Sequence, residues 1–314
     1  MNNVRSIYIM NKIFKHLKNK RALNIIKYNK RISSKLNKTK EDYEKYKLLN
    51  EFNNKYNLNI DDIDKKEINL KGKNIKDKGL KYLNKIVFKE INILNLSFNK
   101  ITDINILQYM SLSKLKNLDL GCNFISNINV LEKIDLRELN ELKLNDNNIT
   151  NINILEKINF KELRVLNLSY NRISDLKILE KVDLKELKEL YLNGIKIKDV
   201  NILEKVNFKK LRKLDLSGNK ISNINILEKV DFKELQELYL NSNEISDIKI
   251  LEKVNFKELK ELYLNCNKIS DINVLQKLNF KELKKLNLCY NKIDEHMNTS
   301  IINYLKSKII KLYI

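Results

Sequence analysis

The sequence predicts an α/β solenoid, a curved right-handed horseshoe with a parallel sheet on its concave face and short helices on its convex face. One observation is a leucine that recurs every 24 residues, at Leu115, Leu139, Leu163, Leu187, Leu211, Leu235, Leu259 and Leu283. Such a fixed period is typical of units that are stable only when stacked. Within each unit, apolar residues first alternate, as at Leu118 and Leu120, which predicts a strand with one buried face. They then recur in steps of three, as at Ile128, Leu131 and Ile134, which predicts a helical turn.

The repeat resembles a known family. Its clearest copy starts at Leu259 and reads L-x-x-L-x-L-x-x-N-x-I, followed by S-D-I-x-x-L. This pattern resembles the leucine-rich repeat, and its second half looks most like the short repeats of internalins and of the regulatory subunit of protein phosphatase 1. Those repeats are usually about 22 residues long, within the range of the family. The extra length here lies in the Glu-Lys-Val-Asn-Phe segment of the outer face. The resemblance implies a leucine-rich-repeat solenoid over residues 67–314, with about nine regular repeats and atypical terminal ones.

The N-terminal segment, residues 1–66, is not part of the repeat. Its first 40 residues contain twelve basic residues and no acidic one, and their apolar spacing predicts short amphipathic helices. The order of Ile13, Phe14 and Leu17 resembles the middle of an F-box, which implies docking of a cullin-type ubiquitin ligase adaptor. The alternative is a small helical cap that shields the first strand, as open arrays need. Residues 41–66 have mixed charge, and we expect them to be a solvated linker.

The ends of the array are expected to be irregular. Residues 68–70 predict a first strand, residues 296–307 a helix, and residues 310–312 a last strand, which gives about eleven strands in all.

A column of asparagines follows the strands, where the chain must turn. A side-chain amide both donates and accepts, so it can satisfy the polar backbone of a buried turn. We expect a structural ladder formed by Asn99, Asn123, Asn147, Asn171, Asn219, Asn243, Asn267 and Asn291. The column is interrupted at Ile195, where we expect either a kink or a turn satisfied by Asn193 or by backbone.

Composition limits the function classes. The net charge of +21 accompanies a sequence rich in Lys, Asn and Ile and without Pro or Trp, as an AT-rich genome would produce. No glycine-rich loop, RNA-binding aromatic motif or zinc spacing accompanies the charge, so we expect no specific nucleic acid partner. No apolar run is long enough to span a membrane and the N-terminus lacks a signal-peptide core. The three cysteines are not in paired clusters, which favours reduced thiols. We therefore expect an intracellular protein.

The variable strand positions on the concave face are the predicted partner-binding site. Two columns contain six acidic and three basic side chains, so this face is negative on a positive protein. Three tyrosines lie among three glutamates there, and tyrosine is favoured at protein interfaces. The predicted binding residues are Asp119, Glu141, Lys143, Glu189, Tyr191, Lys213, Asp215, Glu237, Tyr239, Glu261 and Tyr263.

No catalytic residue, cofactor or metal site is predicted. His16 and His296 lie far apart in the chain, and the recurring Glu-Lys pairs of the outer face are expected to be surface ion pairs. The sequence thus favours a non-catalytic scaffold that binds a protein or peptide. One alternative is a ubiquitin-ligase substrate receptor, and a second is a phosphatase regulatory subunit, which follows from the repeat type alone.

Overall fold

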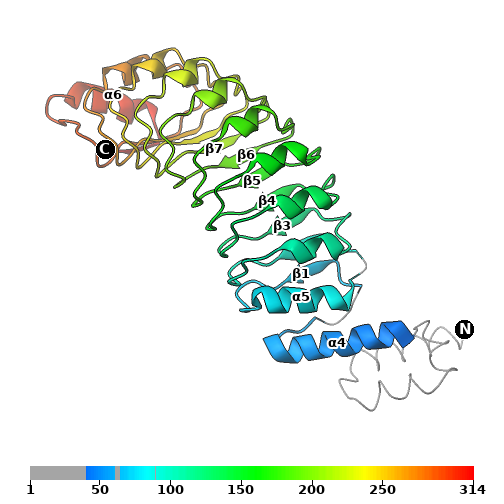
Figure 1. The fold of residues 1–314 in the computed structure, drawn as a ribbon. Coiled ribbons are helices and arrows are strands. Elements are labelled where there is room, and N and C mark those ends of the chain that lie inside the picture. Colours follow the sequence, from blue (N-terminus) through cyan, green and yellow to red (C-terminus); the bar gives the residue numbers. More distant parts are fainter. Residues whose placement is uncertain (1–39, 61–63, 89) are drawn as a thin grey trace, which may run out of the picture.

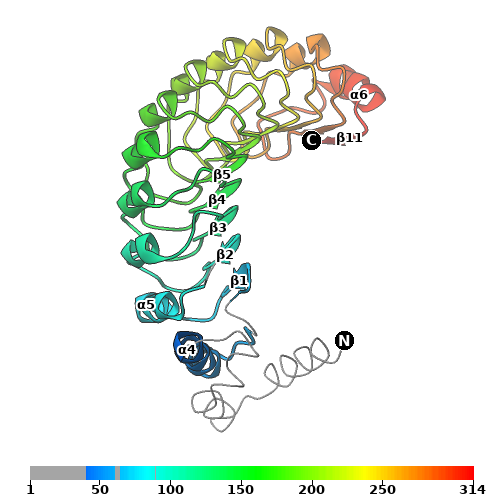
Figure 2. The same cartoon turned by 90° about the vertical axis from the view of Figure 1, so that its right-hand side faces the viewer.

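A computed structural model describes residues 40–60, 64–88 and 90–314 of the chain. They form a curved solenoid whose strands lie along the inner side of the arc and whose short helices lie along the outer side (Figures 1 and 2). The expected horseshoe with a parallel sheet on its concave face is confirmed.

The sheet contains eleven parallel strands, each next to its neighbour in sequence. Each strand has three residues. From β2 to β10 each residue pairs in register with the one 24 positions later, as Leu118 pairs with Leu142, whereas β1 with β2 and β10 with β11 are offset by 26 residues. The strands are β1 (Glu67–Asn69), β2 (Ile93–Asn95), β3 (Asn117–Asp119), β4 (Glu141–Lys143), β5 (Val165–Asn167), β6 (Glu189–Tyr191), β7 (Lys213–Asp215), β8 (Glu237–Tyr239), β9 (Glu261–Tyr263), β10 (Lys285–Asn287) and β11 (Lys311–Tyr313).

The helical turns of the outer face are 3₁₀ helices, which agrees with the apolar step of three residues in the sequence. They are η1 (Asn105–Tyr109), η2 (Asn129–Lys133), η3 (Asn153–Lys157), η4 (Lys177–Glu180), η5 (Asn201–Glu204), η6 (Asn225–Glu228), η7 (Lys249–Glu252) and η8 (Asn273–Lys277). An Asp or Asn lies just before each of these helices, and its side chain accepts a hydrogen bond from the backbone amide two residues later. Asn127, for example, accepts from the Asn129 amide. The strand leucines and the repeated phenylalanines, such as Leu118 and Phe232, form one continuous core.

The two ends of the array differ from the regular repeats. At the C-terminus, α6 (Thr299–Lys308) and β11 confirm the expected helix and last strand. At the N-terminus, α5 (Lys76–Ile86) replaces the 3₁₀ helix of the first repeat, and α4 (Lys40–Tyr56) lies beside it (Figure 2).

The expectation of a solvated linker over residues 41–66 is wrong for α4. Leu49 and Phe52 of this helix are buried, and the Phe52 ring stacks on Tyr82 of α5 with 5.8 Å between ring centroids. Leu49, Phe52 and Tyr56 recur at helical spacing, so one face of a highly charged segment is apolar. This face covers the end of the array, and α4 is therefore a helical cap.

The asparagine ladder is confirmed. Asn123 is representative: its Nδ2 donates to the carbonyls of Leu96, Leu120 and Gly121 at 2.9–3.1 Å. Its Oδ1 accepts from the Ile101 amide at 2.9 Å. One side chain thus satisfies backbone groups of two neighbouring repeats.

At Ile195 the ladder is interrupted. In the regular ladder, the amide equivalent to that of Ile173 donates to an asparagine side chain, as Ile197 does to Asn219, and here that asparagine would stand at position 195. Because Ile195 replaces it, no group among the described residues accepts from the Ile173 amide. The expectation that Asn193 takes over is wrong, because its Oδ1 accepts from the Ser169 hydroxyl instead. The two repeats separate here at a groove.

Pairs of charges connect the repeats on the outer face. Exposed lysines pair with glutamates of the preceding repeat, at Lys157–Glu132, Lys181–Glu156, Lys205–Glu180, Lys229–Glu204 and Lys277–Glu252. Exposed pairs of this kind contribute little to stability, each about 0–1 kcal/mol. Of the helices in the described ranges, none is both long and apolar enough to cross a membrane.

Candidate partner-binding site

The concave face presents two columns of side chains. In β2 to β10 the central leucine is buried, and the residues before and after it are half-buried. Parallel pairing aligns these residues from strand to strand at about 4.8 Å. All eleven predicted binding residues occupy these two columns.

Eight residues of β6 to β10 form the tyrosine cluster, which comprises Glu189, Tyr191, Lys213, Glu237, Tyr239, Glu261, Tyr263 and Lys285. At its centre, Tyr239 and Tyr263 lie opposite each other in neighbouring strands. Their rings stack with 4.4 Å between centroids and an interplanar angle of 9°. The stack forms a rigid aromatic surface of the kind that dominates interface energetics.

Lysines lie over the tyrosine rings. The Lys213 Nζ is 4.8 Å from the Tyr239 centroid and 5.6 Å from that of Tyr191, so it bridges the two rings across β7. Lys285 lies 4.8 Å from the Tyr263 centroid. Such cation–π contacts are each worth about 0.5–2 kcal/mol. They hold the rings at fixed positions along the face.

Each tyrosine also donates to the glutamate two residues before it, on the same face of the strand. The Tyr191 hydroxyl donates to Glu189 at 2.6 Å, Tyr239 to Glu237 at 2.9 Å and Tyr263 to Glu261 at 2.6 Å. Lys213 pairs with Glu237 at 2.8 Å and Lys285 with Glu261 at 3.7 Å. The cluster is therefore internally connected and held in place before any partner binds.

Burial and these bonds fix the protonation states. Burial, together with the hydrogen bonds to Glu189 and Glu237, raises the pKa values of Tyr191 and Tyr239 well above their usual range. For Glu237, burial acts to raise the pKa, but the hydrogen bonds from Lys213 and Tyr239 outweigh it and the net pKa is lowered. The net pKa of Lys213 is raised, because its contacts outweigh the opposing effect of burial. At neutral pH, Tyr191 and Tyr239 are therefore neutral phenols, Glu237 is a carboxylate and Lys213 is an ammonium group.

The remaining predicted residues do not join the tyrosine cluster. The Glu141 carboxylate accepts from the side-chain Nδ2 of Asn117 at 2.5 Å and pairs with Lys143. Asp119 accepts from the Gly121 amide at 2.9 Å. Asp215 lies in register between Tyr191 and Tyr239 but accepts from the amide and hydroxyl of Ser217. The two aspartates are thus used, at least in part, to close turns.

Lys285 belongs to the tyrosine cluster but is not among the predicted binding residues. It occupies the same column position as Lys213, and that equivalence was sufficient to find it. The proposed adaptor-docking residues Ile13, Phe14 and Leu17 lie outside the described residues.

The described part of the chain contains no group of three or more His, Cys, Asp or Glu residues that could hold a metal ion. Cys122, Cys266 and Cys289 are free. Burial, followed by the nearby Asp146, raises the pKa of the Cys122 thiol to about 11, so this thiol is protonated at neutral pH.

Comparisons with known proteins agree with this architecture. A family model described as leucine-rich repeats in two copies matches residues 185–229 and 233–277, and a single-repeat model matches residues 162–176. A search of curated protein sequences returned no significant match.

Solved structures show the same fold. Internalin C2 of Listeria monocytogenes is 26% identical with a TM-score of 0.54, and the match covers 67% of this chain and 83% of that protein. A leucine-rich repeat protein of Leptospira interrogans is 25% identical with a TM-score of 0.59, covering 74% of this chain and 62% of that one. A plant peptide hormone receptor is 18% identical with a TM-score of 0.52, and the match covers 74% of this chain and 38% of that receptor. At this identity the match shows a similar fold only. The 24-residue period, the asparagine ladder and these matches identify the chain as a leucine-rich repeat protein.

Proposed function

We propose that the protein is a non-catalytic scaffold that binds a protein or peptide through the tyrosine cluster on its concave face. Leucine-rich repeats generally mediate protein–protein interaction, and proteins built from them are typically scaffolds without catalytic activity. The observation that carries the proposal is the stacked Tyr239–Tyr263 pair, flanked by Tyr191 and held by Lys213 and Lys285.

The chemistry of the face favours a partner with apolar and basic groups. Aromatic rings that are already ordered lose little conformational entropy on binding and offer apolar area with a polar edge. The two concave columns contain six acidic and three basic side chains. A basic segment would thus meet an excess of carboxylates, while apolar side chains cover the tyrosine rings.

We also propose an intracellular location. Cys266 and Cys289 lie on neighbouring repeats, where the Cys266 amide donates to the Cys289 carbonyl at 2.8 Å, yet both thiols are free. Free neighbouring thiols suit a reducing compartment.

The test is selection of displayed random peptides on the whole protein, followed by affinity measurement on two variants. One variant carries Tyr191→Ala, Tyr239→Ala and Tyr263→Ala. The matched control carries Asn95→Ala, Asn167→Ala and Asn287→Ala, which alter the same column outside the tyrosines. We expect the selected peptides to combine Lys or Arg with apolar residues.

Loss of the three rings should weaken the binding of such peptides by about 100-fold, since interface tyrosines often contribute 2 kcal/mol or more. The control should bind within about threefold of the wild type. Peptides that bind the tyrosine variant as tightly as the wild type would refute the proposal.

A further inference from the structure

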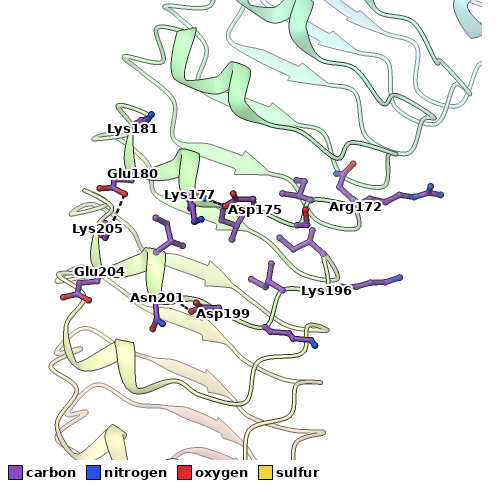
Figure 3. A pocket seen from close by; sticks show the side chains of 18 residues that line it. Arg172, Asp175, Lys177, Glu180, Lys181, Lys196, Asp199, Asn201, Glu204 and Lys205 are labelled. Atoms are coloured by element: carbon purple, nitrogen blue, oxygen red, sulfur yellow. Dashed lines mark hydrogen bonds and ion pairs between the residues drawn. The ribbon is translucent and has the colours of Figure 1, made fainter.

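A groove separates two neighbouring repeats on the side of the solenoid away from the concave face. It has a volume of about 1250 Å³ and is lined by residues between 171 and 181 and between 195 and 205 (Figure 3). None of the tyrosine cluster lines it. The groove extends from the turns that follow β5 and β6 to the 3₁₀ helices η4 and η5, so it is a second surface.

The groove lies where the asparagine ladder is interrupted. At the preceding boundary, the Ile149 amide donates to Asn171 at 3.0 Å and the Arg172 amide donates to the Ile149 carbonyl at 2.9 Å. At the next boundary, neither the amide nor the carbonyl of Ile173 has a hydrogen-bond partner in the described ranges. The Ile173 amide lacks an acceptor among the described residues because Ile195 replaces the asparagine, and the carbonyl lacks its donor at the same boundary.

The opening is confined to the outer side of the boundary. On the strand side, β5 and β6 pair over all three residues. The Leu168 amide still donates to the Tyr191 carbonyl at 3.0 Å, and the Tyr170 amide to the Asn193 carbonyl at 2.8 Å. The two repeats therefore stay joined along the sheet and separate like a wedge beyond it.

Two core residues at the bottom of this wedge are slightly more exposed than their equivalents in neighbouring repeats. Ile197 is 6% exposed, whereas the equivalent Ile149 and Ile221 are 0% exposed. Leu176 is 5% exposed, whereas the equivalent Ile152 is 1% exposed. With Ile195 and Ile202, these side chains form an apolar floor.

The rim of the groove is cationic. Lys198 stands where the other repeats from Thr102 to Ser270 have Ser or Thr, so a second departure from the repeat occurs three residues after Ile195. Lys205 pairs with Glu180 and Lys181 with Glu156, and Asp175 and Asp199 each accept from a backbone amide. In the described part of the chain, the four remaining cations, Arg172, Lys177, Lys196 and Lys198, have no ion-pair partner. Figure 3 shows Arg172 and Lys196 pointing outward at one end of the groove and the Glu180–Lys205 pair at the other.

We propose that this groove binds an acidic peptide segment that inserts an apolar side chain between the two repeats. The apolar side chain would cover Ile197 and Leu176, and carboxylates would pair with Arg172 and with the lysines of the rim. Nucleic acid fits the site less well, because no aromatic side chain lines the groove to stack on a base. The net charge of the whole protein attracts anions in general, but the apolar floor selects among them.

The substitution Ile195→Asn gives a direct test. It creates the order Gly-Asn-Lys-Ile, which the next repeat has at Gly218, Asn219, Lys220 and Ile221. The new side chain would accept from the Ile173 amide and close the groove. A second variant, Arg172→Glu with Lys196→Glu, reverses the rim charge without touching the floor. The control Lys292→Glu makes one of these two charge reversals at the position equivalent to Lys196, next to the intact ladder residue Asn291.

The measurement is fluorescence anisotropy with short labelled peptides of Asp and Glu around a central Leu, on the full chain. We expect the acidic peptide to bind, and Ile195→Asn and the rim variant each to weaken binding by about tenfold or more. Lys292→Glu should change the affinity by less than about twofold, because exposed charges act weakly at a distance. Replacing the central Leu by Gly should also weaken binding by about tenfold.

Three results would overturn the proposal. One is acidic-peptide binding that Ile195→Asn leaves unchanged, since the groove would then be irrelevant. Another is absence of binding to the wild type at any tested peptide concentration. The third is a single-stranded oligonucleotide that binds with the same dependence on Ile195, which would assign the groove to nucleic acid. Tyr239→Ala should leave acidic-peptide binding intact. The proposal for the groove and the proposal for the concave face can therefore be refuted separately.

Discussion

Gly194 illustrates how one residue is constrained both by its backbone and by a neighbouring ring. Its φ of +68° lies in the left-handed region, and a Cβ there would come within 2.5 Å of the Tyr170 ring. Gly218 has a similar φ of +63°, but a Cβ on it would meet nothing closer than 3.6 Å. We expect Gly218→Ala to cost about 1 kcal/mol from backbone strain alone. Gly194→Ala should cost about 1 kcal/mol more from the collision.

Urea unfolding followed by circular dichroism would measure both costs. Tyr170→Ala supplies the control, because removal of the ring should abolish the extra cost of Gly194→Ala but leave that of Gly218→Ala unchanged. Equal costs for the two glycine substitutions in the wild-type background would contradict this interpretation.

The sequence predicted which residues share the concave face, but not how they touch. Period-two alternation places Tyr239 and Tyr263 on one face, and the 24-residue period places them side by side. The stacking of their rings and the position of Lys213 over Tyr239 depend on side-chain rotamers. Rotamers respond to neighbours on three strands at once, and no one-dimensional pattern records them.

Among the elements, the strands and 3₁₀ helices were predictable because each is repeated and the copies average out local exceptions. Helix α4 occurs once, and its many charges obscured an apolar face of Leu49, Phe52 and Tyr56. The groove was also missed, because an asparagine at position 193 looked able to replace the one lost at 195. Its side chain instead accepts from Ser169.

The attachment of α4 to α5 should depend on pH. Tyr82 of α5 donates to Glu51 of α4 at 2.6 Å, and burial together with this hydrogen bond raises the pKa of Tyr82 to about 12 from the usual value of 10.0. The folded state thus favours the neutral phenol. The contribution of this group is fully present below pH 10 and is lost as the pH rises towards 12.

Hydrogen exchange of the α4 amides between pH 10 and 12 tests this expectation. Each observed rate is compared with the intrinsic exchange rate at the same pH, and the ratio gives the protection of the amide. The wild type should lose protection over this interval more steeply than Tyr82→Phe, which cannot ionise. Tyr109→Phe changes a tyrosine that is 70% exposed and should behave as the wild type. If wild type and Tyr82→Phe lose protection in parallel, Tyr82 does not control the attachment.

At the scale of the whole molecule, stability is set by contacts between neighbouring repeats, so the weakest boundary determines cooperativity. The boundary at Ile195 lacks the two hydrogen bonds to Ile173 that its neighbours form, each worth about 1 kcal/mol. We expect hydrogen exchange in moderate urea to show two blocks, one before residue 190 and one after residue 196, that lose protection at different urea concentrations. Ile195→Asn should merge them into one transition, and Ile195→Val should not, because valine has no acceptor for the Ile173 amide. A single transition in the wild type would mean that pairing of β5 with β6 and the shared leucine core couple the halves despite the open wedge.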